Sequence, residues 1–228
     1  VVDLDALRLA LPRSERPLVS VMLANNESGV VQPVAEIAGI VHEAGGVLHV
    51  DAAQGPGRIA CDIGAVGADL MSVSSHKLGG PQGVGALVRR GDVHVGSPLV
   101  RGGGQERGLR PGTENVAAIA GFGAAAAAAR LSNPQELAVL RDQFELRLKS
   151  LTPQVLIFVE TAARLPNTSL FTVPGLKAET AIIAFDLNGV AVSSGSACSS
   201  GKVQASHVLA AMGVEPAIAR GAVRVSLG

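Results

Sequence analysis

The stretch PLVSVMLANNESGVVQPVAEIAGIVHEAGGVLHVD (residues 17–51) predicts a strand, a helix and a second strand in succession. Residues 17–24 form a near-continuous apolar run, which is typical of a strand buried on both faces of a parallel sheet. Residues 34–45 carry apolar side chains at helical spacing and end in glycine. Residues 47–51 are predicted to form the second strand.

Two more strands are predicted at residues 69–75 and 83–90. Strands that alternate with helices indicate an α/β fold with a mostly parallel sheet. In such sheets, ligands bind beyond the carboxyl ends of the strands. The residues that follow each predicted strand are therefore the first candidates for a functional site.

The remainder of the chain predicts a second, smaller domain. A long buried helix is expected at residues 114–130, and Asn133 and Pro134 then begin a new helix that runs to about residue 150. We therefore predict one domain over residues 1–132 and an α+β domain over residues 133–228. The elements predicted after residue 150 are strands at 154–159, 168–173, 190–193 and 222–227, and helices at 178–188 and 206–212.

Composition excludes several classes of protein. The 228 residues carry a formal net charge of zero, and the aromatic residues are five phenylalanines, so we expect no nucleic-acid partner. No apolar run is long and pure enough to suggest a membrane span. The two cysteines are far apart in sequence and suggest free thiols in a reducing, cytoplasmic environment. Because the chain does not begin with Met and ends in an uncovered strand, we expect a fragment truncated at both ends.

A carboxylate and a lysine each follow a predicted strand. Asp51 closes the strand 47–51, with Gln54 shortly after it, and Lys77 follows the strand 69–75, so Asp51 and Lys77 are expected at one edge of the sheet. Two interpretations stay open from spacing alone. One is an ordinary ion pair between strand ends, and the other is pyridoxal phosphate (PLP) chemistry, in which a lysine forms a Schiff base and an acid pairs with the pyridinium nitrogen.

Polar side chains near these two residues are candidates for binding an anion. Ser74 and His76 lie directly before Lys77, where they would hold a phosphate or simply end the strand. The segment RGGGQERGLRPGTEN (101–115) concentrates arginines and glycines before a helix. Thr113 and the amides that follow it would form an anion site at the start of that helix.

The predicted second domain contributes its own candidates. Cys198 lies among small residues in SSGSACSSGK (193–202) and is either a nucleophile or an exposed spectator thiol. Arg224 alternates with valines in the last strand and would bind a substrate carboxylate or remain an edge-strand charge. Asn26 follows the first strand and would contact a ligand or cap a turn. Cys61 and His49 are expected to be structural, and no histidine spacing suggests a metal site.

Taken together, several motifs resemble one family. NNESG, HVDAAQ, SVSSHKLGGPQGVG, GGGQERGLRPGTEN, SSGSACSSG and AVRVSLG occur in the order found in cysteine desulfurases of the class V aminotransferase family, which are PLP enzymes of fold type I. The Cys198 segment resembles that of the group with an extended cysteine loop. The resemblance covers nearly the whole chain. The family's earlier phosphate-binding loop and the histidine that stacks on PLP are not in the sequence, and we expect that the end of the small domain is missing as well.

The resemblance implies a role for each matching residue. Lys77 would bind PLP covalently, Asp51 would pair with its ring nitrogen, and Cys198 would accept sulfur from L-cysteine to form a persulfide while L-alanine is released. The other implied contacts are Gln54 and Asn26 with the ring and substrate, Ser74 and His76 with the phosphate, Thr113 with the phosphate in the partner subunit of a homodimer, and Arg224 with the L-cysteine carboxylate.

Two other functions remain open at this point. An aminotransferase or lyase of the same fold would share Asp51, Lys77 and Arg224 but would not need Cys198. A non-catalytic sulfur-relay or scaffold-binding module would keep Cys198 but would not need HVDAAQ or SSHK. For the parent protein, the resemblance implies an enzyme that passes sulfur to an iron–sulfur scaffold or another acceptor protein.

Overall fold

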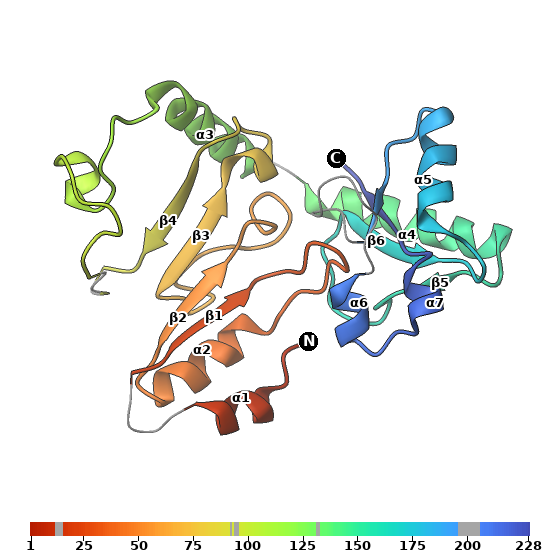
Figure 1. The fold of residues 1–228 in the computed structure, drawn as a ribbon, viewed down its shortest axis with the longest axis horizontal. Coiled ribbons are helices and arrows are strands. Elements are labelled where there is room, and N and C mark those ends of the chain that lie inside the picture. The colour runs from red at the N-terminus through yellow and green to blue at the C-terminus, as the bar shows by residue number, and fades with distance from the viewer. Residues whose placement is uncertain (12–15, 92, 94–95, 131–132, 196–205) are drawn as a thin grey trace. The chain divides into compact units, whose positions relative to one another are not determined.

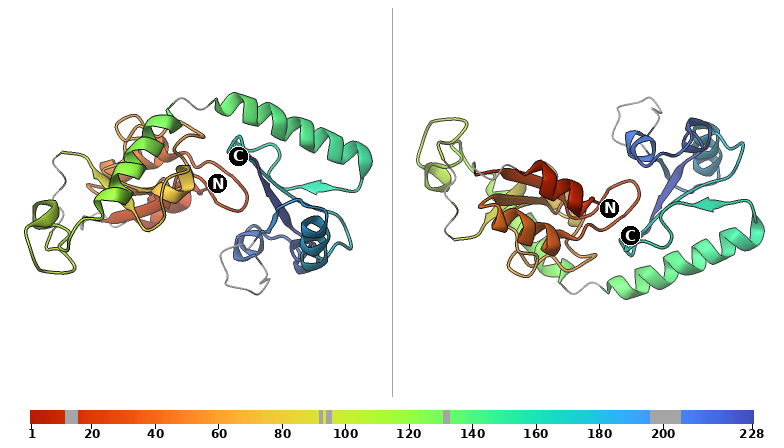
Figure 2. Two further views of the ribbon diagram at one scale, coloured as in Figure 1. Left: turned by 90° about the horizontal axis from the view of Figure 1, so that it is seen from above. Right: turned by 90° about the horizontal axis from the view of Figure 1, so that it is seen from below.

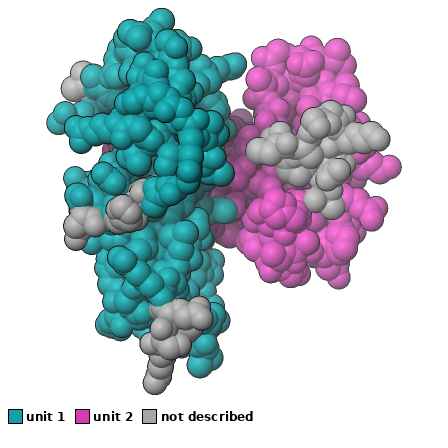
Figure 3. All heavy atoms as spheres, turned by 60° about the vertical axis from the view of Figure 1, so that its left-hand side comes forward, with its two compact units in different colours: residues 1–23, 32–132 teal, residues 24–31, 133–228 magenta. Residues whose placement is uncertain are grey.

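A computed structural model describes residues 1–228 except 12–15, 92, 94–95, 131–132 and 196–205. The chain divides into two compact units, coloured separately in Figure 3. Unit 1 comprises residues 1–23 and 32–132, and unit 2 comprises residues 24–31 and 133–228. Unit 1 thus ends at residue 132, and residues 24–31, which lie between β1 and α2 in sequence, group with unit 2. The domain bounds 1–132 and 133–228 remain a prediction.

Unit 1 is built on a four-stranded sheet of order β1-β2-β3-β4 (Figure 1). The first three strands are parallel and β4 is antiparallel to β3, so the predicted mostly parallel sheet is confirmed. The strands are β1 (Leu18–Met22), β2 (Val47–Asp51), β3 (Leu70–Ser74) and β4 (Gly85–Arg89), and the helices are α1 (Leu4–Ala10), α2 (Val34–Glu43), α3 (Val116–Ala129) and the short 3₁₀ turns η1 (Ser75–Leu78) and η2 (Gln105–Gly108).

One face of this sheet carries the core of unit 1. Leu48 and Val50 of β2 point to it and pack with Ile37 and Val41 of α2, all four fully buried. Helix α1, which the sequence pattern did not indicate, lies beside α2 and adds Leu4 and Leu7 to the same cluster (Figures 1 and 2). Helix α2 ends at Glu43 with Ala44 as its C-cap, and the chain turns through Gly45, whose φ of 71° favours glycine.

The opposite face of the sheet is more open than predicted. Leu18 and Met22 of β1 are 68% and 42% exposed, so the prediction of a strand buried on both faces was wrong for β1. The physical reason is its place at the edge of the sheet with helices α1 and α2 on one face only. On the open face, His49 bridges two strands, with its Nδ1 2.8 Å from Ser20 Oγ and its Nε2 2.7 Å from Ser72 Oγ.

Helix α3 forms where predicted but is not buried. Of its residues, Ala118 is the buried one, whereas Val116 is 72% exposed. One stripe of the helix packs closely: a side chain at Gly121 would place its Cβ 2.6 Å from Pro81 Cγ. The run of alanines gave no polar face from which to predict which side packs, and only a narrow stripe does.

Unit 2 contains an antiparallel sheet of order β5-β6-β8-β7 with helices on it. Its elements are α4 (Pro134–Leu151), β5 (Leu156–Ile157), β6 (Thr168–Thr172), α5 (Ala178–Leu187), β7 (Ser193–Ser194), α6 (His207–Ala211), α7 (Pro216–Ala219) and β8 (Val223–Ser226). Phe171 of β6 packs on Phe144 of α4 with ring centroids 6.0 Å apart. Leu170, the neighbouring residue, points to the other face and packs with Leu209 of α6.

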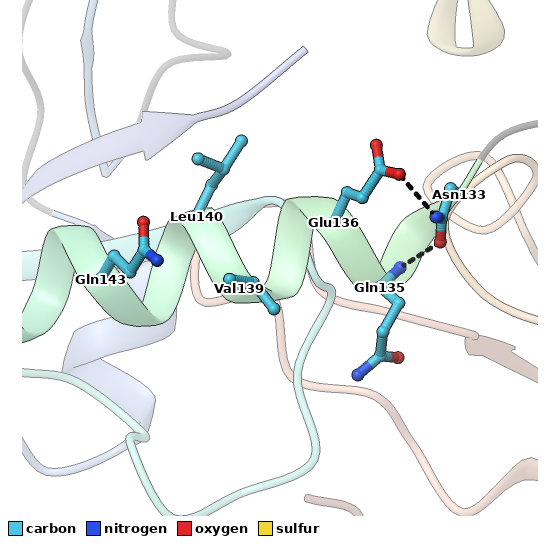
Figure 4. Close-up of a pocket in the computed structure, with 6 residues that line it drawn as sticks. All are labelled: Asn133, Gln135, Glu136, Val139, Leu140 and Gln143. Carbon is cyan, nitrogen blue, oxygen red and sulfur yellow. Dashed lines mark hydrogen bonds between the residues drawn. The ribbon is translucent and has the colours of Figure 1, made fainter.

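Helix α4 begins at the predicted residues. Asn133 Oδ1 accepts a hydrogen bond from the Gln135 amide at 3.2 Å, and its Nδ2 donates to Glu136 Oε1 at 2.8 Å (Figure 4). Pro134 occupies the first helical position, where its lack of an N–H costs nothing. No single helix in the described part of the chain is long and apolar enough to span a membrane. The bent pair α3 and α4 reaches the required length and hydropathy only when the two helices are joined.

Residues 24–31 belong to unit 2 because their backbone is bonded to it. The Leu165 amide donates to the Gly29 carbonyl and the Val31 amide donates to the Ala163 carbonyl, both at 2.8 Å. Gly29 has a φ of 75°, and a Cβ there would lie 3.1 Å from Thr168 Cβ. The segment therefore crosses from the end of β1 to join the antiparallel unit before α2 begins.

At the amino end of the unit 1 sheet, the buried Asp69 joins several elements. Its Oδ2 accepts hydrogen bonds from the Leu48 amide at 2.8 Å and from His42 Nε2 at 2.9 Å, and its Oδ1 lies 2.9 Å from Arg90 Nη2. Burial disfavours the Asp69 carboxylate, but these hydrogen bonds and the nearby positive charges outweigh it and hold its pKa below the ordinary value. The ionised form is therefore the one the fold stabilises.

Replacement of Asp69 tests this contribution. We expect Asp69→Asn to lower the free energy of unfolding at pH 7 by about 1–3 kcal/mol. Because the folded-state pKa is lowered, the stabilisation is present above the unfolded-state pKa and is lost as the pH falls through the folded one. The difference between the two proteins should therefore shrink below about pH 4 in urea titrations.

Asp5→Asn is the matched control, since Asp5 pairs with Arg8 on an exposed helix. It should change the free energy of unfolding by no more than about 0.5 kcal/mol. A difference for Asp69→Asn that stays constant down to pH 2 would contradict the prediction.

Candidate functional site

The carboxyl edge of the unit 1 sheet brings the predicted acid and lysine together. Asp51 is the last residue of β2, and Lys77 lies in η1 directly after β3. The two strands pair in parallel with Asp51 opposite Ser72, so the chain leaves both strands at the same edge of the sheet. This is the edge at which ligands bind in parallel sheets.

Asp51 and Lys77 do not neutralise each other. Both residues lie in the described part of the chain, and no ion pair within 4.0 Å joins them there. Asp51 Oδ1 instead accepts the Ala53 amide at 2.9 Å, which fixes one carboxylate oxygen. The interpretation as an ordinary ion pair is therefore not supported, and both groups remain available for a ligand.

Ser74 and His76 lie together next to Lys77. Ser74 Oγ is 2.9 Å from His76 Nδ1, so the hydroxyl and the imidazole form one polar group at the end of β3. The turn that holds them is tight, because a Cβ at Gly80 would lie only 2.3 Å from the buried Ser75 Oγ. The glycines after Lys77 are thus needed for the chain to turn back toward β4.

Arg58 is a residue of this site that the sequence analysis did not single out. Its Nη1 donates to the Gln54 carbonyl at 3.1 Å and its Nη2 donates to the Lys77 carbonyl at 2.9 Å. One half-buried guanidinium therefore ties the turn after β2 to the turn after β3. The sequence indicates at most the contact with Gln54, which lies four residues before Arg58. The contact with Lys77 spans 19 residues and could not be predicted from local sequence.

Arg58 variants test whether this tie holds the edge together. We expect Arg58→Ala to lower the free energy of unfolding by about 1.5–3 kcal/mol, since it removes two hydrogen bonds from a charged donor. Arg58→Lys should recover part of the loss, because an ammonium group cannot reach two carbonyls with the geometry of the guanidinium fork. Urea denaturation of the two variants measures both effects, and an Arg58→Ala protein as stable as the parent would refute the tie.

Thr113 lies on a loop of unusual backbone geometry. In η2, Glu106 and Arg107 adopt left-handed φ values of 49° and 57°, which non-glycine residues rarely do. Thr113 is exposed and precedes Asn115, whose Oδ1 accepts the Ala118 amide at 3.1 Å and begins α3. The placement of Thr113 before a helix agrees with the sequence, and its binding of a phosphate remains a prediction.

Unit 2 places Arg224 against Asn26. Arg224 Nη1 donates to the Asn26 backbone carbonyl at 2.7 Å, which links β8 to the segment that follows β1 in sequence. Arg224 Nε is buried and has no hydrogen-bond partner among the described residues. A buried N–H without a partner is costly, so this guanidinium is suited to a further acceptor such as a carboxylate.

Of the two cysteines, the structure describes Cys61. Cys198 lies outside the described residues. Cys61 packs against the core of unit 1, donates to the Ile59 carbonyl at 3.2 Å, and has its pKa raised to about 11 by burial. Cys61 is therefore a poor nucleophile at neutral pH, in keeping with its expected structural role.

Thiol labelling tests this assignment. We expect native Cys61 to resist iodoacetamide at pH 8 and to react readily after unfolding, because the unfolded thiol has a pKa of about 8.5. The native rate should rise as the pH approaches 11. Peptide mass spectrometry separates Cys61 from Cys198, and fast native labelling of Cys61 at pH 8 would contradict the prediction.

Other features of the described chain do not add to the site. No group of three histidine, cysteine or acidic side chains that would suit a metal ion occurs among the described residues. A hollow on the first turns of α4 contains none of the predicted site residues (Figure 4). It is lined by Asn133, Gln135, Glu136, Val139, Leu140 and Gln143.

Comparison with solved structures identifies the class to which this sheet and its edge belong. A NifS-like protein from Rickettsia africae superposes with a TM-score of 0.89 at 42% identity, covering 100% of this chain and 61% of that one. The fold is that of PLP-dependent enzymes of fold type I. All of residues 1–228 match the family described as aminotransferase class-V, and the chain belongs to that family.

Curated relatives are more specific. The chain is 43% identical to a cysteine desulfurase of Gluconacetobacter diazotrophicus, covering 99% of this chain and 56% of the relative. It is 44% identical to an IscS-like cysteine desulfurase of Mycobacterium tuberculosis, covering 100% of this chain and 59% of the relative. The chain thus spans a little over half the length of these relatives.

Members of this family depend on PLP, and the residues at the unit 1 edge fit that cofactor. An unpaired carboxylate, a half-buried lysine and a serine–histidine pair occur at one sheet edge. A carboxylate, a lysine amine and a hydroxyl–imidazole pair have the chemistry that would suit the ring nitrogen, the aldehyde and the phosphate of PLP respectively. The fit rests on the chemistry of the side chains present.

Proposed function

We propose that the complete protein is a PLP-dependent cysteine desulfurase that converts L-cysteine to L-alanine and transfers the sulfur to an acceptor protein. The observation that carries this proposal is the presence of Asp51 and Lys77, without an ion pair, at the carboxyl ends of adjacent parallel strands. The similarity to cysteine desulfurases over nearly the whole chain supports the choice of reaction.

The unit 1 residues would hold the cofactor. Bound PLP supplies an aldehyde that condenses with amines and a ring that withdraws electrons from the attached carbon. Lys77 Nζ would bind the aldehyde and, once displaced by substrate, accept the proton from the substrate α-carbon. The Asp51 carboxylate would keep the ring nitrogen protonated. The remaining contacts would come from Ser74 and His76 to the phosphate, Gln54 and Asn26 to the ring and substrate, and Thr113 to the phosphate of a partner subunit.

The substrate and the sulfur acceptor belong to unit 2 in this proposal. Arg224 would bind the L-cysteine carboxylate, which is consistent with its buried, unpartnered Nε. The Cys198 thiolate would attack the substrate sulfur and form the S–S bond of a persulfide as the C–S bond breaks. The electron pair of that bond remains on the substrate carbon, which is protonated to give alanine.

The proposal extends to the partners and location of the protein. We infer a homodimer, because the role proposed for Thr113 requires a second subunit. The persulfide on Cys198 would pass its sulfur to an iron–sulfur scaffold protein or a comparable acceptor in the cytoplasm.

Two substitutions in the complete protein separate this function from its alternatives. Cys198→Ala should abolish sulfide release from L-cysteine while the absorbance of bound PLP persists. Lys77→Ala should remove the Schiff-base absorbance and lower turnover by about 10²–10⁴-fold, the range for loss of a proton-transfer group.

Cys61→Ala is the matched control and should retain activity. Unchanged sulfide release in Cys198→Ala would favour an aminotransferase or lyase. A Lys77→Ala protein with an unchanged spectrum would favour a non-catalytic sulfur-relay module.

A further inference from the structure

The buried carboxylate of Glu27 has no role in the function proposed above. Glu27 is 3% exposed and lies in the segment 24–31 of unit 2. Among the described residues it forms no ion pair with any lysine, arginine or histidine. A buried carboxylate without a cation is costly unless hydrogen bonds compensate for its lost hydration, so its contacts call for an explanation.

The backbone around Glu27 is fixed by Asn25. The Asn25 Oδ1 atom accepts hydrogen bonds from the Glu27 amide at 3.0 Å, from the Ser28 amide at 2.9 Å and from Ser28 Oγ at 3.0 Å. The Asn25 amide in turn donates to the Val30 carbonyl at 2.9 Å. Together with the bonds of Gly29 and Val31 to unit 2 described above, these contacts make the turn a rigid support for the Glu27 side chain.

The Glu27 carboxylate lies next to both ends of one chain segment. Ser206 Oγ donates to Glu27 Oε2 at 2.5 Å, and Ser206 itself is 3% exposed. A Cβ built on the buried Gly195 would lie 3.4 Å from the same Oε2 atom, so Gly195 lies beside this oxygen. Gly195 and Ser206 directly flank residues 196–205, the segment that contains Cys198.

Each end of the segment is also fixed independently of Glu27. Ser206 Oγ accepts the Leu209 amide at 3.0 Å as the N-cap of α6. The Gly195 amide donates to the Ala222 carbonyl at 3.3 Å, next to β8. The Glu27 carboxylate lies near both of these anchored ends, and its hydrogen bond to Ser206 spans 179 residues of sequence.

We propose that Glu27 is a positioning residue for sulfur transfer: its carboxylate holds together the two ends of the segment that carries Cys198. This inference rests on the proposed function and adds to it a residue that does not itself touch the reacting atoms. Holding the ends of a segment together reduces the conformations that its residues can sample, and so reduces the entropy lost when a thiol must reach a substrate.

In the complete protein, we expect Glu27 variants to change persulfide formation but not the binding of substrate or cofactor. Glu27→Ala and Ser206→Ala each remove the hydrogen bond, and each should lower the yield of Cys198 persulfide in a single turnover by about tenfold, as expected for loss of about 1.4 kcal/mol. The KM for L-cysteine and the PLP absorbance should not change, because Glu27 is assigned no contact with either. Glu27→Gln keeps an acceptor oxygen at the same place and should restore most of the persulfide yield.

A second readout does not depend on the cofactor or on turnover. Trypsin cleavage after Lys202 should become about fivefold faster in Glu27→Ala and Ser206→Ala, because opening of a segment governs its proteolysis. Glu145→Gln is the matched control: Glu145 is a buried carboxylate of the same unit, bonded to Arg164 at 2.7 Å. Its loss should lower the stability of the protein without altering persulfide yield or cleavage after Lys202.

The outcomes separate this inference from the proposed function. Loss of sulfide release in Cys198→Ala, with parental persulfide yield and cleavage rate in both Glu27→Ala and Ser206→Ala, would overturn the role of Glu27 alone. A raised KM for L-cysteine at an unchanged cleavage rate would also overturn it, because Glu27 would then bind substrate. If Glu27→Ala does not fold, the persulfide yield and the cleavage rate of Ser206→Ala and Glu27→Gln test the same role.

Discussion

The parallel pairing of β1, β2 and β3 is the constraint on which the candidate site depends. Because Met22, Asp51 and Ser72 pair along one row, the chain leaves all three strands at the same edge. Asp51 and Lys77 both lie at this edge although 25 residues separate them in sequence. A shift of one residue in register would turn the Asp51 side chain to the opposite face, so the hydrophobic core also fixes the chemistry.

Contacts between loops then refine what the sheet brings together. In unit 1, the Arg58 guanidinium links the turn after β2 to the turn after β3. In unit 2, the Glu27 carboxylate accepts a hydrogen bond from Ser206 and lies beside Gly195, the two residues that flank 196–205. Each link uses one charged, wholly or partly buried side chain whose hydrogen bonds offset the cost of its burial. Catalytic side chains would thereby be held by neighbours that take no part in the reaction.

Local sequence patterns predicted most helices and strands of the fold. They did not predict burial and long-range contacts, which depend on tertiary packing. Asn133 and Pro134 mark the start of α4 by their own chemistry, and the apolar runs mark β2 and β3. The burial of α3 was predicted wrongly because an alanine-rich helix has no face that distinguishes core from solvent. Local patterns could not predict that segment 24–31 groups with unit 2, since residues 163–165, to which its backbone is hydrogen-bonded, lie more than 130 residues away in sequence.

The sequence by itself determined the family, the predicted sheet and the residues suited to PLP chemistry, because these depend on residue types in a fixed order. Only the tertiary structure decided that Asp51 and Lys77 form no ion pair, that Arg58 bridges two turns, and that Glu27 accepts a hydrogen bond from Ser206. These contacts join residues distant in sequence through backbone carbonyls and single side-chain oxygens. A backbone carbonyl is present at every residue, and only the folded chain selects which of them a given side chain meets.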